Sequence, residues 1–127
     1  MRLKHFNLEL GSQLMKALGD ETRLRILNLL LRQGAMTTSD LEFILDFTQT
    51  KTSRHIAYLK NAGILLAKKR DQWVMYSIKD EVIEIISQIL SFVEKDNQLE
   101  MDIDTYKTLY SNRELAINNI KLNRLVD

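Results

Sequence analysis

Apolar residues recur at helical spacing through the first part of the chain. Leu10, Leu14 and Leu18 lie four residues apart and share a face, which predicts a first helix over about residues 7–18. Asp20 is a suitable N-cap for a second helix, which continues through many leucine and isoleucine positions. Because so many of its positions are apolar, we expect this second helix to be buried on more than one side.

A short helix, a tight turn and a further helix are expected next. Ser39 and Glu42 have the spacing of a capping box, in which each side chain bonds the backbone N–H of the other residue, and they predict the start of the short helix. Asp46 tolerates the left-handed conformation that such turns often need. Thr48 can then cap a helix that runs to about Asn61.

A β-hairpin and a long helix complete the regular pattern. Residues 64–70 and 73–78 are rich in β-favouring side chains and flank a polar tip, Asp71-Gln72, which predicts two antiparallel strands. From Asp80 onward an apolar stripe follows the 4-3-4 spacing of an amphipathic helix. Its members are Val82, Ile86, Ile89 and Val93.

Beyond this helix the sequence becomes polar and acidic. We expect residues 96–104 to be solvated, because their carboxylates lack the spacing and the glycine of a calcium-binding loop. Ser111 and Glu114 have the spacing of another capping box, which predicts a last helix containing Leu115 and Leu122.

The order helix, helix, short helix, turn, helix, hairpin, long helix is that of a winged helix-turn-helix. The predicted fold is mainly α with a small two-stranded β-hairpin, and it dimerises through its N- and C-terminal helices. We assign residues 1–100 to the winged helix-turn-helix domain and residues 101–127 to a helical extension that takes part in dimerisation. In such a motif the second helix enters the major groove of DNA.

Charge is distributed unevenly along the chain, although the net charge is only +1. Residues 48–79 hold seven lysines and arginines against one aspartate, whereas residues 80–127 hold five basic and ten acidic residues. A basic centre followed by an acidic end favours a polyanion-binding region with a different role for the C-terminal part. The alternative is that the charged residues are scattered at random and their distribution has no function.

The fourth helix and the hairpin carry side chains suited to duplex DNA. Gln49 can form two hydrogen bonds with adenine, and Arg54 or Lys51 can bond guanine. A merely solvated helix explains any one of these residues, but the whole set, entered through a tight turn and followed by a basic hairpin, favours DNA binding. The candidate DNA-binding residues are Thr48, Gln49, Thr50, Lys51, Ser53, Arg54, His55, Lys60, Lys68, Lys69, Arg70 and Gln72.

Composition excludes several other kinds of site. The chain has no cysteine, which excludes disulfides and thiolate chemistry, and its only histidines are His5 and His55, too few for an imidazole-rich zinc site in one subunit. We therefore predict no metal site and no cofactor. The sequence has no apolar run of about 18 residues and no signal-peptide core, so we expect a cytoplasmic protein without a membrane span.

Four motifs, in order, resemble the ArsR/SmtB family of repressors. Residues 16–27 read KALGDETRLRIL, where the family typically reads K-A-L-[SG]-D-P-T-R-L-R-I-L. Residues 49–56 read QTKTSRHI, close to the family's recognition-helix pattern Q-S-T-V-S-R-H-L. Residues 60–65 and 73–78 match the end of that helix and a wing strand, so the resemblance covers about residues 14–80.

The resemblance implies a homodimer that binds an imperfect palindromic operator and is released by an inducer, often a metal or metalloid. It also implies a dimer interface made by the first and C-terminal helices. The apolar stripe after Asp80 is too wide for one small core, which agrees with that interface, although the stripe could also pack within one chain. The expected interface residues are Leu10, Leu14, Val82, Ile86, Ile89, Val93, Leu115 and Leu122.

The sequence departs from the family at its familiar metal sites. Arsenic and cadmium sensors of the family use a C-x-C pair where this chain has Thr37 and Ser39. Zinc-type sensors use histidines after the wing, and no histidine follows His55. At the wing tip Asp71 and Gln72 replace the usual glycine and arginine. The inducer, whether a small molecule or an ion, is therefore not identified by the sequence.

The sequence thus predicts a sequence-specific DNA-binding repressor released by an unidentified signal. The alternative is a winged-helix module that dimerises or docks a protein partner without reading DNA, and the basic stretch over residues 48–79 argues against it. An enzyme is not expected, since the sequence shows no paired carboxylates, nucleophile–base pair or phosphate-binding loop.

Overall fold

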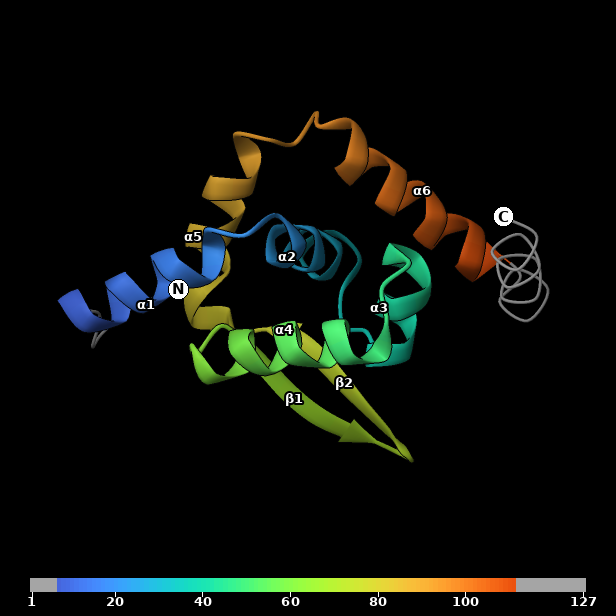
Figure 1. Cartoon of the computed structure of the whole chain (residues 1–127), viewed down its shortest axis with the longest axis horizontal. Coiled ribbons are helices and arrows are strands. Elements are labelled where there is room, and N and C mark those ends of the chain that lie inside the picture. The colour runs from blue at the N-terminus through green and yellow to red at the C-terminus, as the bar shows by residue number, and fades with distance from the viewer. Residues whose placement is uncertain (1–6, 112–127) are drawn as a thin grey trace.

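The helix at the centre of the molecule is the second one, and the other elements pack around it (Figure 1). The structure is a computed structural model that describes residues 7–111. Within that range no helix is long and apolar enough to cross a membrane. The elements are α1 (Leu8–Leu18), α2 (Glu21–Gln33), α3 (Thr38–Leu45), α4 (Gln49–Asn61), β1 (Leu65–Arg70), β2 (Trp73–Ile78), α5 (Asp80–Ser91) and α6 (Asn97–Ser111).

The burial of α2 follows from its sequence, as predicted. Its N-cap is Asp20, whose carboxylate accepts a hydrogen bond from the Arg23 backbone N–H at 3.1 Å. Five consecutive residues, 26–30, are buried, so the helix is covered on every side along this stretch. It ends at Gly34, where φ is 89°, a left-handed conformation that glycine adopts without strain.

The start of α3 differs from the prediction. The capping box is formed by Thr37 and Asp40 rather than by Ser39 and Glu42: the Thr37 hydroxyl accepts from the Asp40 N–H at 3.0 Å, and the Asp40 carboxylate accepts from the Thr37 N–H at 3.2 Å. The reason is the pairing of Met36, the residue directly before Thr37. Met36 is paired with Tyr76 of β2 through two backbone hydrogen bonds of 3.0 and 2.8 Å, so the helix begins as soon as the chain leaves this bridge.

The turn between α3 and α4 agrees with the sequence. Asp46 adopts the left-handed conformation, with φ at 58°, and Thr48 caps α4 by accepting from the Lys51 N–H at 3.1 Å. Together α3, this turn and α4 form the helix-turn-helix. Its two helices pack on each other; α4 also packs on α2 and lies beside β1, and α3 lies beside α6.

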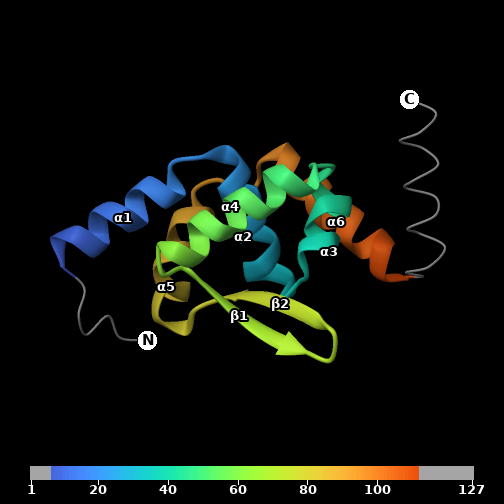
Figure 2. The ribbon, with the colours of Figure 1, turned by 60° about the horizontal axis from the view of Figure 1, so that its bottom comes forward.

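The hairpin is a wing that extends away from the helical body in both views (Figures 1 and 2). Its strands are antiparallel, with Leu65 opposite Ile78 at the base and Arg70 opposite Trp73 at the tip. The base residues are buried in the core, whereas the tip is exposed. The fold is therefore a winged helix-turn-helix, mainly α with one two-stranded hairpin, as predicted.

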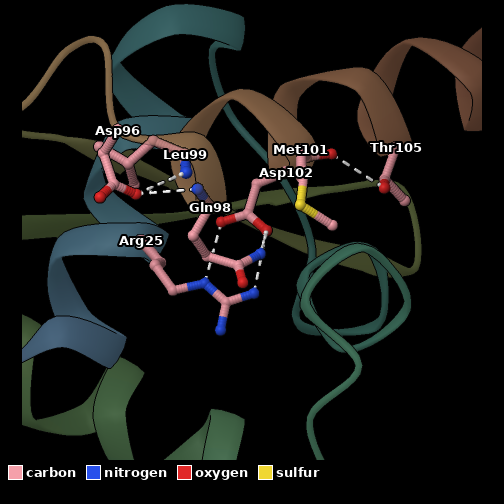
Figure 3. Close-up of polar contacts among 7 residues, drawn as sticks. All are labelled: Arg25, Asp96, Gln98, Leu99, Met101, Asp102 and Thr105. Atoms are coloured by element: carbon pink, nitrogen blue, oxygen red, sulfur yellow. Dashed lines mark hydrogen bonds and ion pairs between the residues drawn. The ribbon is translucent and has the colours of Figure 1, made fainter.

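In the C-terminal part of the described chain, Asp96, Glu100 and Asp104 are exposed, as expected of a solvated acidic segment, but Asp102 is buried and corrects that expectation. Residues 97–111 form one continuous helix, α6, which has no break at residue 100. This helix packs against α2 and α3. Its Ile103 and Leu109 belong to the same hydrophobic core as α2. Asp102 is buried and accepts hydrogen bonds from Nε and Nη2 of Arg25, both at 2.9 Å (Figure 3). A buried cationic partner on α2 is what allows a carboxylate to lie inside the fold.

Candidate nucleic-acid interface

The side of the molecule formed by α4 and the wing gathers the residues expected to bind DNA. Figure 1 shows both elements along its lower edge. All of these residues lie at least partly in solvent, and only Lys51 and His55 are half-buried. The exposed ones are Thr48, Gln49, Thr50, Ser53, Arg54 and Lys60 on or beside α4, and Lys68, Lys69, Arg70 and Gln72 on the wing.

The inner face of α4 fixes which side chains point outward. Thr52 is buried and its hydroxyl donates to the Thr48 carbonyl at 2.9 Å, which satisfies the hydroxyl inside the core. Ile56 and Leu59 continue the buried stripe one and two turns later. Because a helix that buries this stripe must turn its opposite side to solvent, the edge from Gln49 to Arg54 is free to contact another molecule.

The Lys51 ammonium is held at the start of α4. Its Nζ lies 4.0 Å from the centroid of the Phe47 ring, and the guanidinium carbon of Arg25 lies 5.0 Å from the centroid of the same ring. Arg25 is itself bound to Asp102. The turn residue Phe47 therefore joins the recognition helix to the buried ion pair between α2 and α6.

Arg23 ties α1, α2 and α4 together at one point. Its Nε donates to the Ala17 carbonyl at 2.7 Å and its Nη2 donates to the Lys16 carbonyl at 3.0 Å, so it satisfies backbone oxygens at the end of α1. Its guanidinium carbon lies 4.1 Å from the centroid of the Tyr58 ring on α4. The sequence analysis did not assign Arg23 a role, although Arg23 lies in the first of the four motifs that carry the family resemblance.

The contact with Arg23 indicates which nitrogen of the His55 ring carries the proton. Its Nδ1 lies 3.4 Å from Nη1 of Arg23, and because a guanidinium can only donate, Nδ1 accepts and the proton is on Nε2. Burial lowers the pKa of His55 below 6.5, and the positive charges of Arg23, Arg54 and Lys51 lower it further against the opposing effect of Asp20. At neutral pH the ring is uncharged and offers one N–H donor.

The pKa of Asp20 is affected by some of the same neighbouring residues. Burial raises the pKa of Asp20, but the hydrogen bond from the Arg23 backbone N–H and the nearby charges of Arg23 and His55 outweigh burial and lower it below 3.8. The carboxylate is therefore ionised at neutral pH, where it caps α2.

The wing carries its charge on both faces. Side chains of successive strand residues point to opposite faces, so Lys68 and Arg70 share one face and Lys69 lies on the other. All three are exposed. At the tip Asp71 adopts a left-handed conformation with φ at 55°, which closes the hairpin and leaves Gln72 in solvent.

The residues expected at the dimer interface lie in three different environments. Leu10 on α1 and Val93 after α5 are exposed and Ile89 is half-buried, whereas Leu14, Val82 and Ile86 lie in the core of the chain itself. Leu115 and Leu122 lie outside the described residues. Other apolar side chains on α1, α5 and just after α5 are exposed instead, namely Leu8, Met15, Ile83 and Phe92.

No metal site accompanies this surface within residues 7–111, where no three His, Cys, Asp or Glu side chains are grouped to hold an ion. Thr37, one of the two positions where related sensors have cysteine, uses its hydroxyl to cap α3. The other position, Ser39, lies exposed in the first turn of that helix.

Comparison with known proteins agrees with this architecture. Residues 20–65 match the family described as bacterial regulatory protein, arsR family. The transcriptional repressor SdpR of Bacillus subtilis is 32% identical over 90 residues, which are 69% of this chain and 99% of SdpR. The chain belongs to the arsR family of bacterial regulatory proteins. The family and its fold are those of DNA-binding transcriptional regulators, not of enzymes.

Two further proteins show how much of the chain is shared. The arsenic resistance transcriptional regulator ArsR1 of Pseudomonas putida is 39% identical over 83 residues, and the match spans 65% of this arsR-family chain and 65% of ArsR1. The structure of HlyU from Vibrio cholerae superposes with a TM-score of 0.62 at 29% identity and covers 69% of this chain and 96% of HlyU. Each match thus covers about two thirds of this chain.

Proposed function

We propose that this arsR-family protein binds double-stranded DNA in a sequence-specific way and represses transcription until a signal releases it. The observation that carries the proposal is the position of α4. One side of the helix is locked into the core through Thr52, Ile56 and Leu59, while the polar edge from Gln49 to Arg54 faces solvent. A rigid helix that presents polar and basic side chains beside a basic wing has the shape and charge needed to enter the major groove.

The side chains on α4 have separate roles in this proposal. Gln49 reads adenine and Arg54 reads guanine, because their paired donors and acceptors match those base edges. Thr48, Thr50 and Ser53 are short, exposed hydroxyl groups that bond phosphates and position the helix. The neutral His55 contributes its Nε2–H to a phosphate oxygen. Lys51 adds positive charge at the N-terminal end of the helix, where the helix dipole already favours an anion.

The wing supplies contacts that do not depend on sequence. Lys68, Lys69 and Arg70 bring positive charge to the DNA backbone or the minor groove, and Gln72 extends from the tip. Lys60 adds a further charge near the end of α4. Each phosphate that such a group neutralises releases a counterion, so affinity falls as the salt concentration rises.

Two copies of the chain are needed to read a palindromic operator. We propose that they meet through α1 and α5, where Leu8, Met15 and Phe92 are exposed and would otherwise face water. In that dimer the two α4 helices reach half-sites about 34 Å apart, one turn of the double helix. The protein acts in the cytoplasm with the DNA, and its inducer is a small molecule or ion whose identity is open.

A DNA-binding assay with the gene's own upstream region tests the proposal. Fluorescence polarisation at several salt concentrations, with unrelated competitor DNA, should show tight binding that survives the competitor and weakens steeply with salt. The alternative function is a protein-interaction module that uses the winged helix without reading DNA. Absent binding, or binding that does not change with salt, would favour that module and overturn the repressor.

A further inference from the structure

A hollow of about 380 Å³ lies between α2, α5 and the start of α6, on a different side of α2 from the recognition helix. Leu31 of α2 and Leu90 of α5 form its apolar wall, and Asn28 of α2 also lines it. A hollow of this size is large enough for a small metabolite. None of the residues proposed to contact DNA lines it.

Asn28 is the unusual residue of this hollow. Its side chain is only 3% exposed, and its Nδ2 amide group has no hydrogen-bond acceptor. Within residues 7–111 it is the one buried side-chain nitrogen or oxygen left without a partner, whereas the buried Thr52 and Asp102 are bonded. Folded proteins satisfy nearly all such groups, so this donor calls for an acceptor from outside the chain, and a guest in the hollow reaches it when the Asn28 side chain turns, because the Nδ2 atom itself is closed to solvent.

The mouth of the hollow carries charges of both signs. Arg32 of α2 and Glu100 of α6 form an ion pair, with Nη1 3.7 Å from Oε1. Glu94 and Lys95, which follow α5, also line the hollow. Two positive and two negative side chains disfavour a simple anion or cation, and they suit a molecule that bears both charges.

We propose that this hollow binds a small zwitterion of the amino-acid class. The carboxylate accepts from Asn28 Nδ2 and from Arg32, the ammonium faces Glu94 and Glu100, and an aliphatic side chain lies on the leucine wall. This arrangement satisfies the one unpaired buried donor of the described chain and neutralises each charge of the guest.

The position of the hollow connects this guest to the recognition helix, a step that rests on the proposed DNA binding. Glu100 lies two residues before Asp102 on α6, and Asp102 holds Arg25 in the contact shown in Figure 3. Arg25 and Lys51 lie over the same Phe47 ring, at the turn that leads into α4. A guest ammonium that draws Glu100 away from Arg32 therefore shifts the helix that anchors this contact and lowers the affinity for the operator.

The binding step is tested without DNA, by NMR titration of the full-length ¹⁵N-labelled protein. The standard L-amino acids are added one at a time to about 10 mM, the range in which weak metabolite sites are seen. The expected result is saturable movement of the Asn28 side-chain amide signals for at least one amino acid. Its N-acetyl and C-terminal amide forms, which each lack one charge, should bind at least about tenfold more weakly.

Variants then assign the signal to the hollow. Asn28→Leu should abolish binding and melt no lower than the parent protein, since it removes a donor that has no partner in the fold. Glu100→Gln should weaken binding at least about tenfold, whereas Glu84→Gln, an exposed position of α5 outside the hollow, should leave it unchanged. Glu100→Gln keeps the test decisive if Asn28→Leu does not fold. No movement with any amino acid, equal binding of the blocked forms, or full binding by Glu100→Gln would overturn the site.

A separate measurement tests whether binding of the amino acid lowers the affinity for the operator. With the amino acid identified by NMR present at saturation, the operator affinity in polarisation should fall about tenfold for the parent protein and stay constant for Asn28→Leu. Amino-acid binding without a change in operator affinity would overturn the coupling and leave the site. Absent DNA binding would overturn the proposed repressor, while the NMR result would still decide the site.

Discussion

Arg25 of α2 grips Asp102 of α6 with two hydrogen bonds, from Nε and Nη2, each 2.9 Å long. The carboxylate is 2% exposed and the arginine side chain 22% exposed, so the carboxylate is removed from water and the arginine is mostly covered. Gln98 adds a third hydrogen bond to the same carboxylate, at 3.0 Å from its Nε2 (Figure 3). This pair is the polar anchor of α6 on the helix-turn-helix.

Removing the anion of this pair should destabilise the fold. In Asp102→Ala the Arg25 guanidinium loses its partner while still mostly buried, and breaking such a pair costs about 3 kcal/mol in the free energy of unfolding. Urea unfolding followed by circular dichroism measures the change. Asp104→Ala, an exposed neighbour on the same helix, is the matched control and should alter stability by less than about 0.5 kcal/mol. Equal effects of the two variants would show that the pair contributes nothing specific.

The true position of the α3 cap can be measured in the same way. Thr37→Ala removes one half of the capping box and should lower the free energy of unfolding by about 1 kcal/mol. Ser39→Ala changes an exposed hydroxyl inside the first turn and should have almost no effect, because alanine also favours a helix. A larger loss for Ser39→Ala than for Thr37→Ala would restore the cap expected from the sequence alone.

Residues that read bases and residues that contact the DNA backbone should give different results in DNA titrations. Gln49→Ala and Arg54→Ala should each cost about 1–3 kcal/mol on the operator and relax specificity at individual base pairs. Lys68→Ala should weaken binding to every sequence and reduce the salt slope by about one. The measurement is polarisation with operator and random duplexes over a range of salt. Equal losses on both duplexes for Gln49→Ala would exclude direct base reading by that residue.

Stability should depend on pH through His55. Its folded pKa lies below 6.5, so above that value the ring is neutral in both states and its contribution is complete. As the pH falls below 6.5 the unfolded chain takes up the proton first, and stability drops until the folded pKa has been passed. Asp20 acts in a lower range: its pKa is below 3.8, so its contribution is lost only as the pH falls through that region. Urea unfolding from about pH 8 to about pH 5 isolates the histidine.

The variant His55→Gln supplies the comparison for this pH series. It keeps His5 and removes only the ring that faces Arg23, so the decline between neutral pH and about pH 5 should become shallower. An unchanged slope would mean that His55 has the same pKa in the folded and unfolded chain.

The exposed apolar side chains near α1 and α5 should determine the oligomeric state. Phe92, which is 87% exposed, is replaced by serine, and sedimentation velocity should show a shift from dimer to monomer at micromolar concentration. Met101→Ser on α6, 57% exposed, removes a comparable side chain away from this surface and should leave the dimer intact. A dimer that survives Phe92→Ser together with Leu8→Ser would place the interface elsewhere.

The elements that could be predicted from the sequence are those specified by neighbouring residues. Asp20 and Thr48 are caps within the segments they start, and Asp46 bends the turn that contains it, so a few residues suffice to locate each. The outward edge of α4 follows in the same way from its buried stripe. Local signals of this kind explain why the order of elements and the exposure of the candidate DNA-binding residues could be stated before the structure was known.

The features that the sequence missed depend on distant partners. In the sequence, Asp102 is indistinguishable from the other acidic residues of a polar stretch, because its partner, Arg25, is 77 residues away. Thr37 rather than Ser39 begins α3 because Met36 is held by the second wing strand. The long apolar stripe of α5 left both packing within the chain and packing on a second copy open, and the structure places Val82 and Ile86 in the chain's own core.

Arg23 has a consequence for operators with altered spacing. One guanidinium holds both the end of α1 and the Tyr58 ring of α4, so the helix proposed for the subunit contact and the helix proposed to enter the groove are fastened to each other at a single side chain. In the proposed dimer, the separation of the two α4 helices is thereby set by how the two α1 helices pair. A dimer without Arg23 would keep its grip on one half-site but tolerate inserted or deleted base pairs between the halves.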